Sequence, residues 1–158
     1  DSSTSRGLGD VYKRQVMQIQ NILVVCVGNI CRSPMAEYFF KQELPHLKIH
    51  SAGISGLVGH PADEKAQHCM AELGIQMQAH VARKLNAELI KQADLILVMS
   101  QNQQKHVEQT WPFAKGKTFR LGHWQGRNVA DPYQKDQETF NEACALIQQC
   151  VTDWKNHI

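Results

Sequence analysis

The sequence predicts a three-layer αβα fold of the α/β class, with a four-stranded parallel central sheet and a phosphate-binding loop after the first strand. Three observations lead to this prediction. Short runs rich in Val, Ile and Leu alternate along the chain with longer amphipathic stretches, and strands that alternate with helices form parallel sheets. Turn-forming Gly and Asn follow the first apolar run. They lie at the carboxyl end of a strand, where α/β proteins bind ligands.

The first apolar run, Gln20 to Val27, is apolar on both faces, as a strand inside a parallel sheet is. Three further strands are expected over residues 48–51, 94–99 and 118–121.

Helices are expected where apolar side chains recur at spacings of three and four and where end signals are present. After the loop, we expect Ser33 to cap a helix that starts at Pro34 and ends near Leu44. Gly74 is expected to end a second helix. This helix and the remaining ones are expected over residues 63–73, 85–91, 102–110 and 138–154.

The composition fits a single domain, which we place over residues 17–158. Hydrophobic residues make up 42% of the chain, and 17 basic and 15 acidic side chains give a net charge of +2. This charge is too small to indicate a nucleic-acid surface. No apolar stretch approaches the roughly 18 residues of a membrane span. We therefore expect no nucleic-acid partner and no membrane insertion.

Residues 1–16 are polar and follow neither a helical nor a strand period, so we expect them to be a disordered, non-native extension. They lack the apolar segment of a secretory signal. The chain has five cysteines, and an odd number in a chain of this size favours reduced thiols over a disulfide framework. Together these features predict a cytoplasmic protein.

The segment from Cys26 to Ser33 contains the groups that bind and attack a phosphate. Its Gly-Asn pair lets the backbone curl so that N–H groups point inward around an anion. The next helix directs its positive end at the same point. Arg32 adds a planar guanidinium that grips two phosphate oxygens. These groups favour the nucleophilic thiolate of Cys26, so the segment predicts a phosphatase with a cysteinyl-phosphate intermediate.

Transfer of the phosphoryl group also needs an acid that protonates the leaving oxygen. Asp131 is the candidate, because the proline after it restricts its backbone to extended conformations. Tyr133 offers a flat wall against an aromatic substrate. Together the two side chains favour aryl phosphates, and hence phosphotyrosine.

Three segments, VCVGNICRSP at 25–34, SAG at 51–53 and DPY at 131–133, resemble those of the low-molecular-weight protein tyrosine phosphatases. The resemblance runs from about Ile19 to Trp154. Further segments resemble the bacterial type found in capsule and exopolysaccharide operons, namely residues 57–63, 80–83, 122–124, 131–135 and 138–140.

This resemblance implies roles for the residues of the site, without a metal or a cofactor. Cys26 would be the nucleophile, Arg32 the phosphate clamp, and Asp131 the general acid that later acts as the base for water. The other members of the phosphate-binding loop would be Val27, Gly28, Asn29, Ile30, Cys31 and Ser33.

Residues around the loop also gain roles from the resemblance. Ser51 and His80 would join Asn29 and Ser33 in a hydrogen-bond network that supports the loop. The substrate wall would include Leu57 and Tyr133.

Two interpretations of Cys31 stay open: a small loop residue, or a thiol that forms a protective disulfide with Cys26, which the resemblance implies. The other thiols are expected to lie in the core or at the surface, at Cys69, Cys144 and Cys150.

The implied partner is a phosphotyrosine protein, namely a membrane tyrosine autokinase that controls polysaccharide export and offers its cytoplasmic tail. Two other functions are less favoured. An arsenate reductase on the same fold needs two relay cysteines shortly after the third strand, and residues 100–106 contain none. A non-catalytic phosphotyrosine-binding module would be expected to lack Cys26, Arg32 or Asp131.

Overall fold

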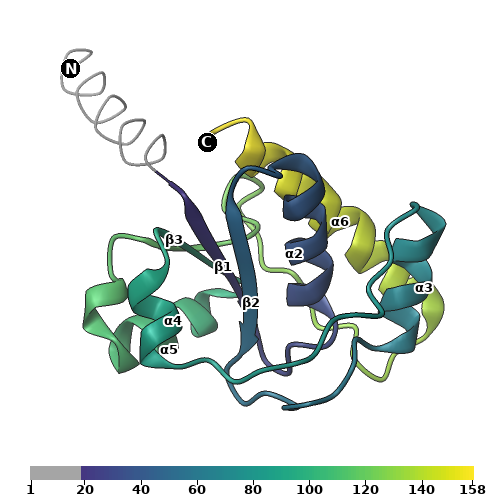
Figure 1. Cartoon of the computed structure of the whole chain (residues 1–158), viewed down its shortest axis with the longest axis horizontal. Coiled ribbons are helices and arrows are strands. Elements are labelled where there is room, and N and C mark those ends of the chain that lie inside the picture. The colour runs from purple at the N-terminus through teal and green to yellow at the C-terminus, as the bar shows by residue number, and fades with distance from the viewer. Residues whose placement is uncertain (1–18) are drawn as a thin grey trace.

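The computed structural model describes residues 19–158, so the extension expected over residues 1–16 lies outside the described part. Four parallel strands form one sheet in the order β2-β1-β3-β4. Figure 1 shows this sheet at the centre of the molecule. The strands are β1 (Asn21–Cys26), β2 (Lys48–Gly53), β3 (Leu95–Val98) and β4 (Thr118–Arg120). The predicted four-stranded parallel sheet is thereby confirmed.

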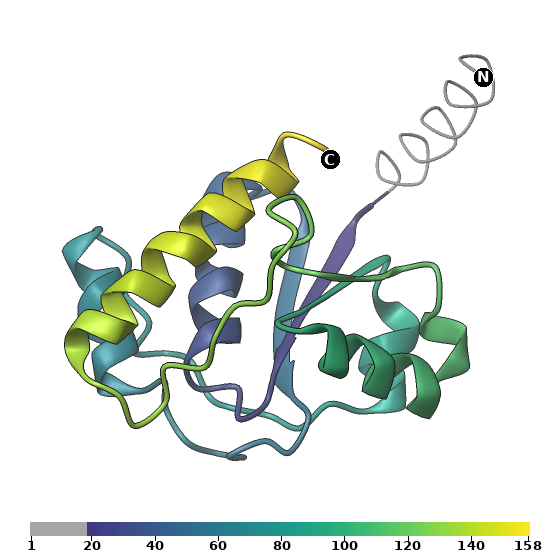
Figure 2. The same ribbon diagram turned by 180° about the vertical axis from the view of Figure 1, so that it is seen from behind.

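Helices cover both faces of the sheet (Figure 1). One face carries α2 (Arg32–Glu43), α3 (Glu64–Glu72) and α6 (Gln137–Lys155). The other carries α4 (Ala87–Gln92) and α5 (Gln101–Thr110), followed by the short helix η1 (Pro112–Ala114). Helix α6 packs against α2 and α3, and Figure 2 shows it running along that face from behind. The predicted three layers are therefore present.

The core is divided by the sheet into two clusters of buried side chains. The larger cluster lies towards α2, α3 and α6 and contains Phe40, Phe140 and Trp154. The smaller cluster lies towards α4 and α5 and contains Ile90 and Val107. Strands β1 and β3 are buried almost throughout, because each lies between two other strands and beneath helices on both faces.

The start of α2 differs from the prediction. The helix begins at Arg32, Cys31 occupies the capping position, and no side chain caps the first turn. Ser33 is not the cap, because its hydroxyl lies 2.9 Å from Cys26 Sγ and accepts a hydrogen bond from Asn29 Nδ2. Ser33, which the sequence predicts as the helix cap, therefore supports the loop through its side chain instead of capping the helix.

The other boundaries follow the prediction closely, with two informative details. Asp63 caps α3 by accepting the N–H of Lys65, and Gly74 ends it with a φ of 79° that suits glycine. Strand β2 extends to Gly53, where the chain pairs with Lys84. Among the helices of residues 19–158, none has both the length and the apolar character needed to cross a bilayer.

Candidate active site

The segment from Cys26 to Ser33 curls at the carboxyl end of β1, where the sheet order places the loops of neighbouring strands. Cys26 is the last residue of β1 and is almost fully buried. Its Sγ accepts the backbone N–H of Asn29 at 3.3 Å and lies 2.9 Å from Ser33 Oγ. Donors from the middle and the end of the loop thus converge on the sulfur.

Asn29 is the centre of the network that supports the loop. It is fully buried and has a φ of 61°, a left-handed conformation that Asn tolerates better than most residues. Its Nδ2 donates to Ser33 Oγ at 2.8 Å and to Ser51 Oγ at 2.9 Å. Its Oδ1 accepts the backbone N–H of Arg83, and its carbonyl oxygen lies 2.7 Å from His80 Nε2. The structure therefore brings together the four residues expected in this network.

The chemistry of the amide fixes the direction of these hydrogen bonds. An amide nitrogen only donates, so both serine oxygens accept from Asn29 and must direct their own protons elsewhere. Ser51 donates its proton to the carboxylate of Glu37. Ser33 is left with Cys26 Sγ as its acceptor. The network thus ends in an O–H group that donates to the sulfur.

Two residues of this network were missed by sequence reasoning. Glu37 is a buried carboxylate that accepts from Ser51 and pairs with Lys41 Nζ at 2.6 Å. Its spacing of four from Ser33, on the same helical face, is the only local signal. Arg83 supplies a backbone donor to Asn29, and its Nε donates to the carbonyl oxygen of Ser51 at 3.0 Å. A backbone contact of this kind leaves no pattern in the sequence.

Arg32 connects the loop to the segment that contains Asp131. Its Nη1 donates to the carbonyl oxygen of Val129 at 2.8 Å, and its Nη2 lies 3.4 Å from Asp131 Oδ2. Its Nε is buried, and no acceptor within residues 19–158 lies in hydrogen-bond reach of it. A buried guanidinium with an unpaired N–H beside the cysteine is suited to a ligand oxyanion.

A small cavity of about 50 Å³ opens above the sulfur. Tyr133 stands at its rim, 42% exposed, and its N–H donates to Asp131 Oδ1 at 3.1 Å. The loop, the predicted acid and both residues of the predicted wall therefore share one cavity, which is lined by Cys26, Val27, Gly28, Ile30, Cys31, Arg32, Leu57, Asp131 and Tyr133.

The four remaining cysteines are all buried. Burial, together with the nearby charge of Asp63, raises the pKa of the Cys31 thiol, so this side chain is held in its neutral form. Both interpretations of Cys31, as a small loop residue or as a thiol that forms a disulfide with Cys26, stay predictions. Burial also raises the pKa of Cys150, to about 11. Among the described residues, no three His, Cys, Asp or Glu side chains gather as ligands for a metal ion.

A parallel αβα sheet whose first strand ends in a cysteine-to-arginine anion loop, with an aspartate beside the arginine, defines a class of cysteine-dependent phosphatases. Comparison with known proteins gives the family. Residues 21–158 match the family described as low molecular weight phosphotyrosine protein phosphatase, and the chain belongs to it.

Individual relatives agree with this assignment. The low molecular weight protein-tyrosine-phosphatase Ptp of Acinetobacter johnsonii is 73% identical over 142 residues, which are 90% of this chain and 100% of the relative. The structure of Vibrio vulnificus Wzb in complex with benzylphosphonate is 38% identical, with a TM-score of 0.86 over 89% of this chain and 99% of that one. The arginine phosphatase YwlE of Geobacillus stearothermophilus is 30% identical, with a TM-score of 0.82 over 87% and 91% of the two chains.

Proposed function

We propose that the segment from Cys26 to Ser33 hydrolyses phosphotyrosine through a phosphate ester of the Cys26 thiol. The observation that carries this proposal is the convergence on Cys26 Sγ of a backbone N–H and a serine hydroxyl, with Arg32 and Asp131 in the same cavity. The chain is a protein-tyrosine-phosphatase of the low-molecular-weight type. The assignment of each step to a residue is our proposal.

In the first step the thiolate of Cys26 attacks phosphorus, the sulfur–phosphorus bond forms, and the bond to the phenolic oxygen breaks. Backbone N–H groups of the loop and the guanidinium of Arg32 bind the three phosphoryl oxygens, whose charge they stabilise in the transition state. Asp131 gives its proton to the leaving phenolate. This side chain is 45% exposed and lies 3.4 Å from Arg32 Nη2, beside the oxygens that the guanidinium would hold.

In the second step Asp131, now a carboxylate, takes a proton from water as the water oxygen attacks phosphorus. The sulfur–phosphorus bond breaks, and inorganic phosphate and the Cys26 thiolate are released. Ser33 supports both steps, because its O–H remains directed at the sulfur that first attacks and then leaves.

The cavity also supports an aromatic substrate. Leu57 and Tyr133 line its walls, and half-exposed Val27 adds to its apolar rim. A phenyl ring that enters between these side chains would place its phosphate at the sulfur. We further propose that the substrate is the cytoplasmic tail of a membrane tyrosine autokinase of polysaccharide export, which would place this protein in the cytoplasm. The segments that resemble the capsule and exopolysaccharide enzymes support this finer proposal.

The experiment compares turnover of p-nitrophenyl phosphate and of a phosphotyrosine peptide by the unmodified chain, Cys26→Ser and Cys150→Ser. Cys150 is the matched control, since its buried thiol donates to Gln125 Oε1 and lies outside the cavity. We expect Cys26→Ser to abolish turnover of both substrates and Cys150→Ser to retain it. Retained turnover in Cys26→Ser would overturn the proposal.

A second arm tests the substrate class. Phosphotyrosine, phosphoserine and phosphoarginine peptides of one sequence are offered to the unmodified chain. We expect phosphotyrosine to be preferred by at least tenfold in kcat/KM. A preference for phosphoarginine would instead favour an arginine phosphatase, the activity in the name of the YwlE relative. Where a neighbouring gene encodes a membrane tyrosine autokinase, release of phosphate from its phosphorylated cytoplasmic tail tests the finer proposal, and failure to release phosphate would overturn it.

A further inference from the structure

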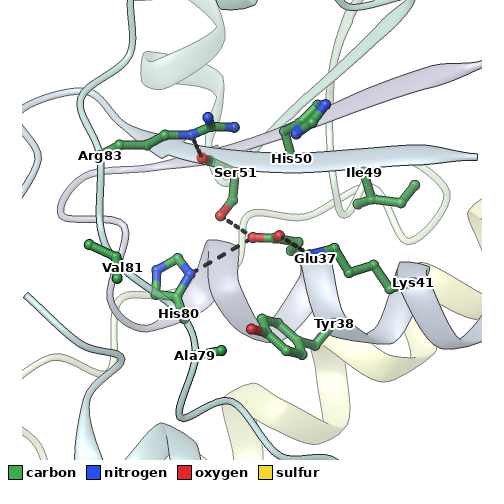
Figure 3. Close-up of a pocket in the computed structure, with 10 residues that line it drawn as sticks. All are labelled: Glu37, Tyr38, Lys41, Ile49, His50, Ser51, Ala79, His80, Val81 and Arg83. Atoms are coloured by element: carbon green, nitrogen blue, oxygen red, sulfur yellow. Dashed lines mark hydrogen bonds and ion pairs between the residues drawn. The ribbon is translucent and has the colours of Figure 1, made fainter. Parts of the chain in front are cut away.

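The two halves of the catalytic site are held in place in different ways. The loop that carries the nucleophile is supported by a buried network, and Figure 3 shows part of it, with Ser51 and His80 beside the carboxylate of Glu37. Asp131, by contrast, has a side chain that is 45% exposed. An acid must stay within hydrogen-bond reach of the oxygen that it protonates. The contacts that hold the segment around Asp131 therefore decide how well it can act.

We call residues 129–135, which contain this aspartate, the acid segment. Its first residue, Val129, is buried and anchored in the core. The N–H of Val129 donates to the carbonyl oxygen of Met99 at 2.8 Å, directly after β3. Its own carbonyl oxygen accepts from Arg32 Nη1 at 2.8 Å. The start of the acid segment is thus bound both to the sheet and to the phosphate clamp.

The end of the acid segment is a tight turn with a strained backbone. The N–H of Lys135 donates to the carbonyl oxygen of Pro132 at 2.9 Å. Between them, Gln134 has a φ of 66°, a left-handed conformation that is unfavourable for glutamine. Such a conformation is kept only where the surrounding contacts require it. This turn therefore needs an anchor of its own.

Lys65, the second residue of α3, supplies that anchor. Its Nζ donates to the carbonyl oxygen of Lys135 and lies 6.0 Å from the centre of the ring of buried Phe140. In the opposite direction, Nε2 of Gln137 donates to the carbonyl oxygen of Lys65 at 3.0 Å. Two reciprocal hydrogen bonds therefore join the first turn of α3 to the end of the acid segment and the start of α6.

The same turn of α3 also contacts the phosphate-binding loop. Asp63 caps the helix by accepting the N–H of Lys65 at its Oδ1, at 2.9 Å. The backbone N–H of Asp63 donates to the carbonyl oxygen of Ile30 at 2.9 Å. The first turn of α3 thus lies between the loop that carries the nucleophile and the turn that follows the acid. Through it, Lys65 fixes the acid segment relative to the loop.

We propose that Lys65 is a positioning residue for the general acid, which it keeps in reach of the leaving oxygen by holding the end of the acid segment. This inference rests on the proposed acid role of Asp131. Lys65 is not among the residues that line the catalytic cavity, so it acts through the backbone of the acid segment. Without its hydrogen bond, Asp131 spends less time beside the leaving oxygen. Only a leaving group that needs a proton is then released more slowly.

The test compares kcat/KM for two substrates in the unmodified chain, Lys65→Met and Lys65→Arg. This ratio covers the steps up to release of the phenol and leaves out hydrolysis of the intermediate. Lys65→Met should lower kcat/KM for phenyl phosphate by about fivefold, the value of one exposed hydrogen bond, and for 2,4-dinitrophenyl phosphate by less than twofold. Lys65→Arg keeps a donor for the carbonyl oxygen of Lys135 and should recover most of the loss.

The matched control is Lys155→Met. Lys155 is also an exposed lysine of one contact, because its Nζ pairs with Glu43 at 2.8 Å near the far end of α6. This variant removes the same charge and should keep kcat/KM for both substrates. Urea unfolding of each variant confirms that the samples compared are folded.

A double variant separates this inference from the function on which it rests. In Asp131→Asn the acid is absent, so adding Lys65→Met should cause no further loss with phenyl phosphate. If Asp131→Asn alone leaves phenyl phosphate unaffected, the proposed acid role itself fails.

Three results would overturn the role of Lys65 while the acid role stands. The first is unchanged turnover of phenyl phosphate in Lys65→Met. The second is an equal loss for the two substrates, which would show a general effect on binding or folding. The third is a loss of the same size when Lys65→Met is added to Asp131→Asn.

Discussion

The direction of the hydrogen bonds around Asn29 can be tested by a substitution that changes almost nothing else. Asn29→Asp keeps the size of the side chain and its tolerance of the left-handed backbone. It also keeps an Oδ acceptor for the N–H of Arg83. It replaces the Nδ2 donor to Ser33 and Ser51 by an oxygen that only accepts. Each serine hydroxyl must then donate its single proton to the new carboxylate. If it does not, two oxygen atoms face each other with no proton between them.

The consequence for catalysis can be estimated from the bond that is lost. When Ser33 turns towards the new carboxylate, it no longer donates to Cys26 Sγ. A hydrogen bond to a charged group contributes roughly 1.5–3 kcal/mol. Since about 1.4 kcal/mol corresponds to a factor of ten, kcat/KM should fall by roughly tenfold to a hundredfold. Ser33→Ala removes the same bond without adding charge and should lose a similar factor.

The assay is steady-state turnover of p-nitrophenyl phosphate, with urea unfolding on the same samples to separate activity from stability. Asn141→Asp is the matched control, because it adds the same charge on the exposed face of α6. It should keep the activity of the unmodified chain. The reasoning is refuted if Asn29→Asp stays folded and keeps kcat/KM within threefold, while Ser33→Ala loses tenfold or more.

Three further predictions concern the acid, the loop and pH. Asp131→Asn should slow the first step with phenyl phosphate by on the order of 100-fold. The first step with 2,4-dinitrophenyl phosphate, whose phenolate leaves without a proton, should slow by far less. Equal losses in the rate of the first step for the two substrates would contradict an acid role. Gly53→Ala would place a Cβ 2.6 Å from the carbonyl oxygen of Val27, so the loop must shift, at a cost of about 1–3 kcal/mol in urea unfolding; unchanged stability and turnover would refute this contact. Burial, and next the charge of Arg120, lower the pKa of His123 below its ordinary 6.5. The unfolded chain therefore takes up this proton first, and stability present above pH 6.5 is lost as the pH falls; His123→Gln should lose less stability between pH 7 and 5, and an equal loss would count against this.

The sequence predicts the strand, the loop and the acid because their signals are local. Cys26 and Arg32 lie six residues apart in one turn, and a proline follows Asp131. The sheet follows from the alternation of apolar runs and helices. These features depend on short-range sterics and on periodicity, which a single sequence contains.

Contacts between distant segments were not predictable in the same way. Glu37 looks like an ordinary acidic residue near a helix start, and its part in the network depends on Ser51 of β2. Arg83 contributes a backbone N–H, which every residue except proline has. The prediction that Ser33 caps α2 was wrong, because the contact of its hydroxyl with Cys26 competes with a hydrogen bond to the first turn of the helix. Tertiary packing decides such cases, as it often does at functional sites.

The central claim, that Cys26 carries the phosphoryl group, is tested most directly by trapping it. In Asp131→Asn, 2,4-dinitrophenyl phosphate should still react in the first step, and the second step should lack its base, so the intermediate should accumulate. Acid quenching, digestion and mass spectrometry would then locate the phosphate. The account predicts one phosphate on Cys26 and a burst of dinitrophenolate equal to the enzyme concentration. Phosphate on another residue, or turnover without a phosphorylated enzyme, would contradict it.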